Sequence, residues 1–137
     1  LYGRDGRLTA YRSRHFGTTD RLRRGAAGIL GQWPGVTHLA IEGGGPLAVV
    51  WRRLAAGRGV TVITLAAEDW RRRLLPPRDQ RTGPDAKRAA TAMARRVIDW
   101  SGAPRPTSLR HDAAEAIMAG LWAVLKLGWL TDPPPRP

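Results

Sequence analysis

Residues 37–45 read Thr-His-Leu-Ala-Ile-Glu-Gly-Gly-Gly, and the predicted fold is built around this stretch. Its apolar run predicts a short buried strand that carries a carboxylate, Glu42, at its last position. The three glycines that follow allow a nucleic-acid backbone or a metal ion to approach closely. An unpaired charge at the end of a buried strand is costly. We therefore expect Glu42 either to pair with an arginine or to join other carboxylates around a cation.

The segment after this strand predicts an α/β fold. Pro46 is placed as a first-turn proline, and the helix that it opens ends near Gly57. The β-branched residues 60–65 then predict a second strand. A strand, a helix and a strand in this order imply two parallel strands joined by a crossover.

The remaining segments predict a hairpin and four more helices. Residues 1–16 are expected to form an antiparallel hairpin, and a helix follows that is capped by residues 18–20 and stopped by Pro34. Further on, residues 78–84 predict a polar, basic loop that we expect to be mobile. The other three helices are a short one opened by Glu68, one over residues 85–100, and one from a cap at Ser108 to about Leu127. The expected fold is a mixed sheet, with an antiparallel hairpin and parallel strands, flanked by helices.

The composition is strongly basic. Lys and Arg number 23 against 11 Asp and Glu, so the formal net charge is +12 in 137 residues. Such an excess in a small protein indicates a polyanionic partner, with nucleic acid as the leading candidate.

The length fits one domain, expected at residues 1–130, and the Pro-rich tail at residues 131–137 is expected to be extended or disordered.

Two absences narrow the classes of protein. The sequence has no cysteine, which excludes thiolate metal sites. Any metal would be bound by oxygen or imidazole, which favours Mg²⁺ or Mn²⁺. No apolar run approaches the roughly 20 residues of a membrane span, and no signal peptide opens the sequence. A soluble, intracellular protein without a membrane partner is expected.

Two acids on the last predicted helix indicate a metal site. Residues 109–125 are apolar on nearly all sides, and Asp112 and Glu115 are the only charges from residue 112 to residue 125. Their spacing places them on one face, where like charges repel. Protonation, an arginine or a divalent cation relieves such repulsion, and the cation accounts for both acids at once. The alternatives are that Asp112 interacts with the helix dipole, that Glu115 pairs with an arginine, and that His111 belongs to the helix cap rather than being a ligand or an acid-base group.

Five segments in this order also carry a resemblance to a known family. They are Leu39–Glu42, the helix with Gly57-Arg58-Gly59 after it, the strand at residues 60–65, Gly83–Ala89 and His111–Ala116. Together they resemble RuvC-type Holliday junction resolvases of the RNase H-like superfamily, along nearly the whole chain. The resemblance implies an RNase H-like fold in which Glu42 is the second catalytic carboxylate, Asp112 the third and Glu115 the fourth, where aspartate is more usual. The family's first acid, an aspartate of an N-terminal strand, has no match in this sequence, and Asp5 in the hairpin turn is a poor substitute.

The resemblance implies a metal-dependent, structure-selective endonuclease that acts as a homodimer on four-way DNA junctions. Two Mg²⁺ or Mn²⁺ ions per active site would be held by Glu42, Asp112 and Glu115. His111 lies beside a position where relatives use histidine, and Lys87 matches a basic residue near the active site. DNA contacts are expected from exposed cations: Lys87, Arg88, Arg73, Arg78 and Arg81. A YqgF-type nuclease that processes RNA is the enzymatic alternative, and a basic nucleic-acid-binding module without catalysis is the other. A cytoplasmic location in a bacterial or phage-infected cell is expected.

Overall fold

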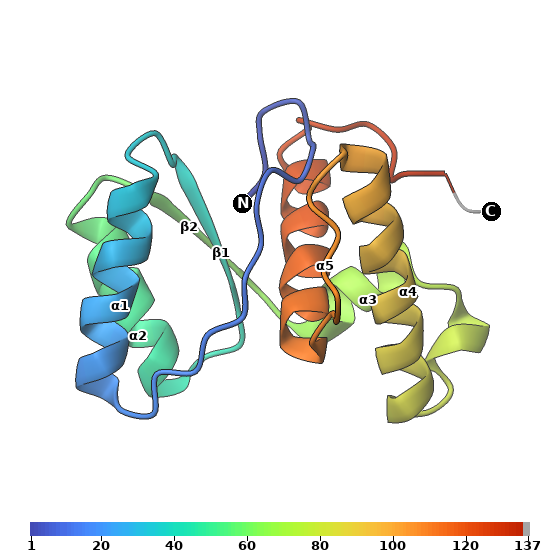
Figure 1. Cartoon of the computed structure of the whole chain (residues 1–137), viewed down its shortest axis with the longest axis horizontal. Coiled ribbons are helices and arrows are strands. Elements are labelled where there is room, and N and C mark those ends of the chain that lie inside the picture. The colour runs from blue at the N-terminus through green and yellow to red at the C-terminus, as the bar shows by residue number, and fades with distance from the viewer. Residues whose placement is uncertain (136–137) are drawn as a thin grey trace. The chain divides into compact units, whose positions relative to one another are not determined.

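The computed structural model describes residues 1–135, which form two compact units (Figure 1). Unit 1 comprises Leu1–Ser13 and the chain from Ala67 onward, and unit 2 comprises Arg14–Ala66. The elements are α1 (Thr19–Gln32), β1 (His38–Glu42), α2 (Gly45–Ala56), β2 (Thr61–Leu65), α3 (Ala67–Leu74), the 3-10 helix η1 (Pro77–Gln80), α4 (Gly83–Ser101) and α5 (His111–Lys126). The chain is therefore of the α/β class, as predicted.

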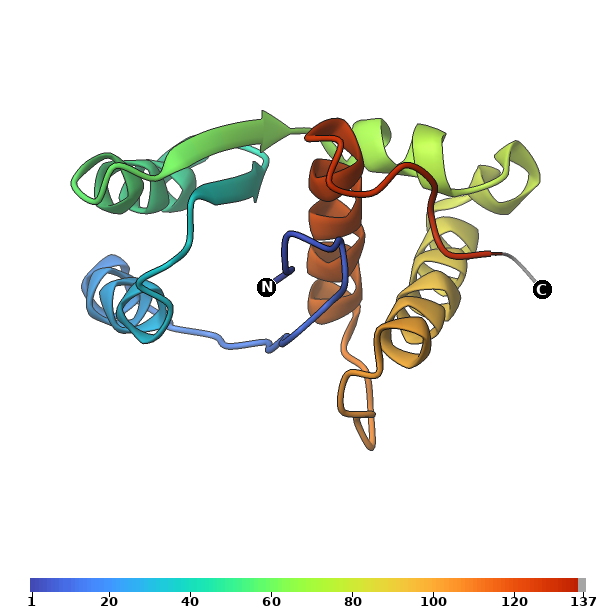
Figure 2. The same cartoon turned by 90° about the horizontal axis from the view of Figure 1, so that it is seen from above.

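Unit 1 is a helical unit in which α4 and α5 pack against each other. The segment at residues 102–110 connects the end of α4 to the start of α5 (Figure 1). Viewed from above, α3 lies beside α5 and η1 lies beside α4 (Figure 2). The centre of the unit is apolar, because Trp70 of α3 and Met118 and Leu121 of α5 are fully buried. Burial of such large side chains is the main source of stability for a unit of this size.

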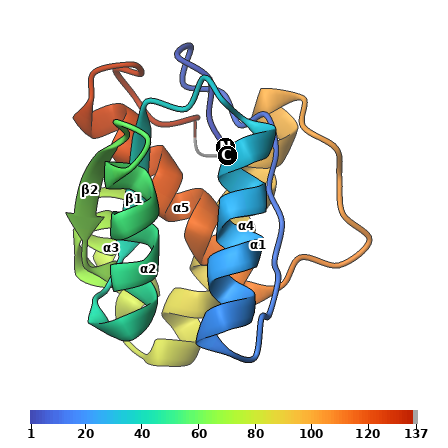
Figure 3. The same cartoon turned by 90° about the vertical axis from the view of Figure 1, so that its left-hand side faces the viewer.

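Unit 2 contains the predicted parallel pair of strands. Residues 38–42 pair with residues 61–65 in parallel, with His38 opposite Thr61 and Glu42 opposite Leu65. The crossover helix α2 packs against both strands. Helix α1 lies beside α2 (Figure 3), and their contact buries Leu22, Ala26 and Val50. The prediction of two strands joined by a helical crossover is thus confirmed.

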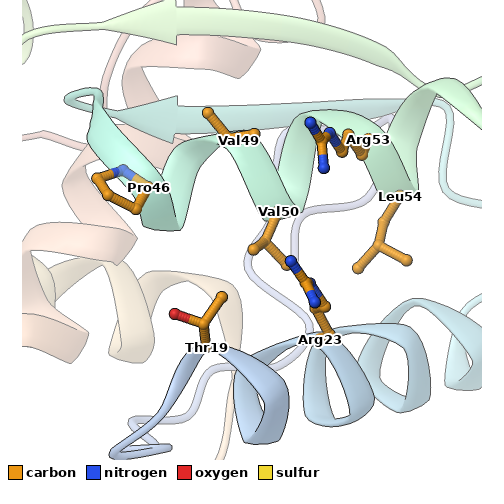
Figure 4. Close-up of a pocket in the computed structure, with 7 residues that line it drawn as sticks. All are labelled: Thr19, Arg23, Pro46, Val49, Val50, Arg53 and Leu54. Carbon is orange, nitrogen blue, oxygen red and sulfur yellow. The ribbon is translucent and has the colours of Figure 1, made fainter.

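Helix α2 is only partly covered within unit 2. Val50 is buried, but Leu47 and Val49 are 61% and 41% exposed. A groove of about 380 Å³ lies between α1 and α2, with apolar walls and the side chains of Arg23 and Arg53 at its edge (Figure 4). The apolar stripe of α2 is therefore broader than the packing inside unit 2 requires.

The predicted N-terminal hairpin is reduced to one antiparallel bridge, between Tyr2 and Leu8. The hydroxyl of Tyr2 donates a hydrogen bond to the carbonyl oxygen of Ile117 (2.7 Å), and the N–H of Leu8 donates to Oγ of Ser101 (3.0 Å). These bonds anchor the segment to α5 and α4 in place of strand pairing. Within residues 1–135 the only sheet has two parallel strands, so the structure does not show a mixed sheet.

Two other expectations need correction. Helix α5 begins at His111 after an N-cap at Arg110, not at a Ser108 cap, and the carboxylate of Asp112 accepts a hydrogen bond from the first-turn N–H of Ala113. The expected mobile loop at residues 78–84 is partly the 3-10 helix η1. The side-chain amide of Gln80 stabilises this turn, because it donates hydrogen bonds to the carbonyl oxygens of Arg71 (3.1 Å) and Leu75 (2.8 Å).

Three further predictions concern the Pro-rich tail, membrane spans and the number of domains. Residues 133–135 of the Pro-rich tail have no helix or strand, and its last two positions, 136 and 137, lie outside the described residues. None of the helices within residues 1–135 combines the length and the apolar composition needed to cross a lipid bilayer. The single domain expected at residues 1–130 stays a prediction.

Candidate functional site

Three side chains that could bind a ligand or take part in a reaction lie within the first two turns of α5. We call them the α5 site: His111, Asp112 and Glu115. His111 and Asp112 are exposed, whereas Glu115 is half-buried. The side chains of Ala113 and Ala114, which face inward between them, are buried. Asp112 and Glu115 therefore lie three residues apart on α5, and their joint binding of a cation stays a prediction.

Asp112 is held as an ionised carboxylate. The hydroxyl of Ser13 donates a hydrogen bond to its Oδ2, and the N–H of Ala113 donates to its Oδ1 at 2.9 Å. Nε of Arg110 lies 3.5 Å from the same Oδ1. The Ser13 hydrogen bond is the largest cause that lowers the pKa of Asp112, and it outweighs the opposing effect of desolvation. Asp112 therefore carries a full negative charge at neutral pH.

Glu115 pairs with an arginine from another helix. Its Oε1 lies 3.6 Å from the guanidinium of Arg71 on α3, and the two side chains are 29% and 28% exposed. The guanidinium also lies over the ring of Trp70, 5.2 Å from the ring centre. The arginine alternative considered for Glu115 is therefore the one present in this structure.

His111 is linked to α4 through Thr91. Nδ1 of His111 lies 3.3 Å from Oγ1 of Thr91. The same hydroxyl donates a hydrogen bond to the carbonyl oxygen of Lys87 at 2.9 Å. Lys87 and Thr91 are four residues apart and share one face of α4. Thr91 thus links the imidazole of His111 to the backbone carbonyl of Lys87, a contact in which the Lys87 ammonium group takes no part.

The five predicted DNA-contacting cations all belong to unit 1 and are exposed. They lie on α3, around η1 and in the first turns of α4: Arg73, Arg78, Arg81, Lys87 and Arg88. Arg88 pairs with Asp85, and Arg78 lies 3.7 Å from Asp79. The other three make no ion pair within the described part of the chain, so their charges are open to a phosphate.

Glu42 belongs to unit 2, at the carboxyl end of β1. The strand is half-buried rather than buried, and Glu42 is exposed because it is the last residue of a five-residue strand. Gly43 and Gly45 follow with φ values of 79° and 80°, which residues with a side chain rarely adopt. The expected cost of a buried charge therefore does not arise. The convergence of Glu42 with the α5 site stays a prediction.

The donor atoms of the α5 site suit a hard cation, but they are too few. Asp112 and Glu115 offer carboxylate oxygens, which Mg²⁺ and Mn²⁺ prefer. Within residues 1–135 no group of three or more His, Asp or Glu side chains is arranged to hold a metal ion. A carboxylate-bound metal centre would require Glu42 beside the two α5 acids.

Sequence reasoning did not identify three residues that contact the α5 site: Ser13, Arg71 and Thr91. Thr91 had a usable signal, because it lies one helical turn after Lys87. Ser13 and Arg71 reach the site from distant segments, and no local pattern marks them.

No known protein family matches this chain, and no curated protein or solved structure is detectably similar to it. A function is therefore inferred from the chain's own residues and from the resemblance that they carry.

Proposed function

We propose that this protein is a RuvC-type, metal-dependent endonuclease that hydrolyses phosphodiester bonds in branched DNA and has an RNase H-like fold. The observation that carries the proposal is the α5 site, in which an ionised Asp112 stands three residues from Glu115 and beside His111. A parallel strand pair that ends in Glu42 supports it. The net charge of +12 supports a nucleic acid as the substrate.

Each site residue has a role that follows from its chemistry. Glu42, Asp112 and Glu115 would hold Mg²⁺ or Mn²⁺, with two ions per active site. When bound, such ions supply an activated water and neutralise the charge that develops on the leaving oxygen. Asp112 is already ionised, whereas Glu115 must exchange Arg71 for the ion. Lys87 is exposed, and its ammonium group would contact the phosphate that is cleaved.

The exposed arginines of unit 1 would contact the phosphates of the DNA backbone. Contacts to phosphates give affinity and orientation but read little sequence, which suits an enzyme that selects a junction by its shape. A homodimer would place two active sites on opposing strands of a four-way junction. Leu47 and Val49 on α2 offer an exposed apolar surface of the kind that subunit contacts use.

The test is cleavage of a labelled four-way junction in the presence of Mg²⁺ or Mn²⁺. Glu42→Gln and Asp112→Asn should abolish cleavage while leaving junction binding intact, because each removes a metal ligand but no phosphate contact. Glu68→Gln is the matched control, since Glu68 is an exposed acid in the first turn of α3, outside the site. Cleavage by Glu42→Gln at nearly the wild-type rate would refute the proposal.

The ion pair between Glu115 and Arg71 favours a second function, which is nucleic-acid binding without catalysis. A basic nucleic-acid-binding module without catalysis would keep this ion pair permanently. It would bind junctions without any dependence on Mg²⁺ and would nick no substrate with any metal. The same cleavage assay should include duplex DNA and structured RNA as substrates. A YqgF-type nuclease would cleave the RNA.

A further inference from the structure

Thr91 connects two residues of the proposed active site. Its hydroxyl lies 2.9 Å from the carbonyl oxygen of Lys87, one turn earlier on α4. The same oxygen lies 3.3 Å from Nδ1 of His111, the first residue of α5. The two contacts meet where the first residue of α5 lies beside the middle of α4, which spans Gly83–Ser101.

The single proton of the threonine hydroxyl decides the direction of the second hydrogen bond. A hydroxyl has one O–H donor and two lone pairs, whereas a carbonyl oxygen can only accept. Because the contact with Lys87 requires a donor and is the shorter one, the Thr91 proton points at that carbonyl. Oγ1 is then an acceptor toward His111, and Nδ1 of the imidazole must carry a proton. In a neutral ring the lone pair is then on Nε2.

We propose that Thr91 is a positioning residue that holds His111 as the Nδ1–H tautomer and leaves Nε2 as its reactive nitrogen. The ring is exposed, and within residues 1–135 it makes no hydrogen bond other than the one to Thr91. Nε2 therefore carries a lone pair that accepts no hydrogen bond within the described residues. Hydrogen bonds from an outer residue set the tautomer of functional histidines in this way. The effect on cleavage rests on the proposed function, whereas the tautomer does not.

A purely structural role for Thr91 gives different expectations. A helical threonine often bonds the carbonyl four residues earlier, and that bond alone needs no histidine. Under this alternative, removal of the Thr91 hydroxyl would leave the tautomer of the His111 imidazole unchanged. Two variants separate the alternatives, because Thr91→Val keeps the shape but removes the hydroxyl, and Thr91→Ser keeps the hydroxyl.

The direct test is nitrogen-15 NMR of the His111 ring in alkaline buffer, where imidazoles are neutral. The wild-type protein and Thr91→Ser should show Nδ1–H, and Thr91→Val should show a new population of Nε2–H. Circular dichroism checks that the variants remain folded. A wild-type ring that is mainly Nε2–H, or a Thr91→Val spectrum identical to that of the wild type, would overturn the proposal.

Single-turnover cleavage of a four-way junction supplies the second test. Thr91→Val should slow cleavage on the order of tenfold at unchanged junction affinity, as loss of an outer-shell partner does elsewhere, and Thr91→Ser should restore the rate. The double variant Thr91→Val/His111→Gln should be no slower than His111→Gln alone, because Thr91 acts through His111. Additive losses would refute this. If the wild-type protein cleaves nothing, the proposed function fails, and the NMR result alone decides the role of Thr91.

Discussion

The guanidinium of Arg71 lies 3.6 Å from the carboxylate of Glu115, and about seven-tenths of each side chain is covered. Arg71 is not fully satisfied in this position, because its Nε is buried and has no hydrogen-bond partner within the described residues. A buried donor without a partner weakens the arrangement that holds it. Arg71 therefore occupies the place of a cation at the fourth proposed catalytic acid, and a metal ion would have to compete with it.

Arg71→Met should raise the affinity of the protein for Mn²⁺. A half-buried ion pair of this kind contributes ~1 kcal/mol, and its removal is expected to tighten metal binding about fivefold. Isothermal titration calorimetry measures the change. The control is Arg72→Met, which removes the same charge from an exposed neighbour that makes no ion pair within residues 1–135. Equal affinities in the two variants would show that Arg71 does not compete for a metal ligand.

Ser13→Ala should raise the pKa of Asp112 toward its ordinary value of 3.8. The Ser13 hydroxyl is the largest cause of the lowered pKa, since it donates a hydrogen bond to the charged form of the carboxylate. Carbon-13 NMR of the Asp112 carboxyl group, followed through a pH titration, measures the shift. Ser108→Ala is the control, because the Ser108 hydroxyl makes no hydrogen bond within residues 1–135. Superimposable titration curves for all three proteins would contradict the assignment.

The same bond gives the stability of unit 1 a defined dependence on pH. Because the folded-state pKa of Asp112 is lowered, the contribution is fully present above the unfolded value of 3.8. It is lost as the pH falls through the folded-state pKa, where Asp112 becomes protonated. The difference in free energy of unfolding between the wild type and Ser13→Ala should therefore be larger near neutral pH than in acid, as urea unfolding at both pH values measures.

The parts of the fold that could be predicted are those that local patterns determine. The strand at residues 38–42, the proline-started α2 and the β-branched β2 form a crossover unit whose geometry allows few alternatives. The placement of Asp112 and Glu115 three residues apart on one helix also followed from the local pattern. In each case neighbours within a few residues carry the information.

The parts that could not be predicted depend on contacts between distant residues. The N-terminal segment has strand-like alternation, but Tyr2 is anchored on Ile117, 115 residues away, and Leu8 on Ser101. These anchors replace the predicted hairpin. The partners of the α5 site are distant in the same way, since Ser13 lies 99 residues from Asp112. A single sequence carries no local signal for such pairs.

Two glycine substitutions should change stability in opposite directions. Gly28 lies in α1, and apart from its chain neighbours and the helix's own backbone nothing lies within 4 Å of the position that a Cβ would take. Gly28→Ala should therefore stabilise α1 by about 0.5–1 kcal/mol. At Gly120 a Cβ would lie 2.4 Å from Cε2 of Tyr2, whose hydroxyl is bonded to Ile117. Gly120→Ala should therefore destabilise unit 1 by about 1–3 kcal/mol. Hydrogen exchange of the α1 and α5 amides reports each effect separately, and slower exchange of α5 in Gly120→Ala would show that the Tyr2 contact is loose.

The exposed cations of unit 1 should determine how DNA binding responds to salt. Arg73 and Arg81 make no ion pair within the described residues, so each can take a phosphate and release a counterion. In Arg73→Gln/Arg81→Gln the slope of log affinity against log salt should fall by about 2, since each phosphate contact to duplex DNA contributes about 0.9. Fluorescence anisotropy with a labelled four-way junction measures the slope. Arg23→Gln is the control, because Arg23 on α1 is already paired with Asp20 at 3.2 Å, and its slope should stay close to that of the wild type. An unchanged slope in the double variant would mean that DNA binds to other cations of the chain.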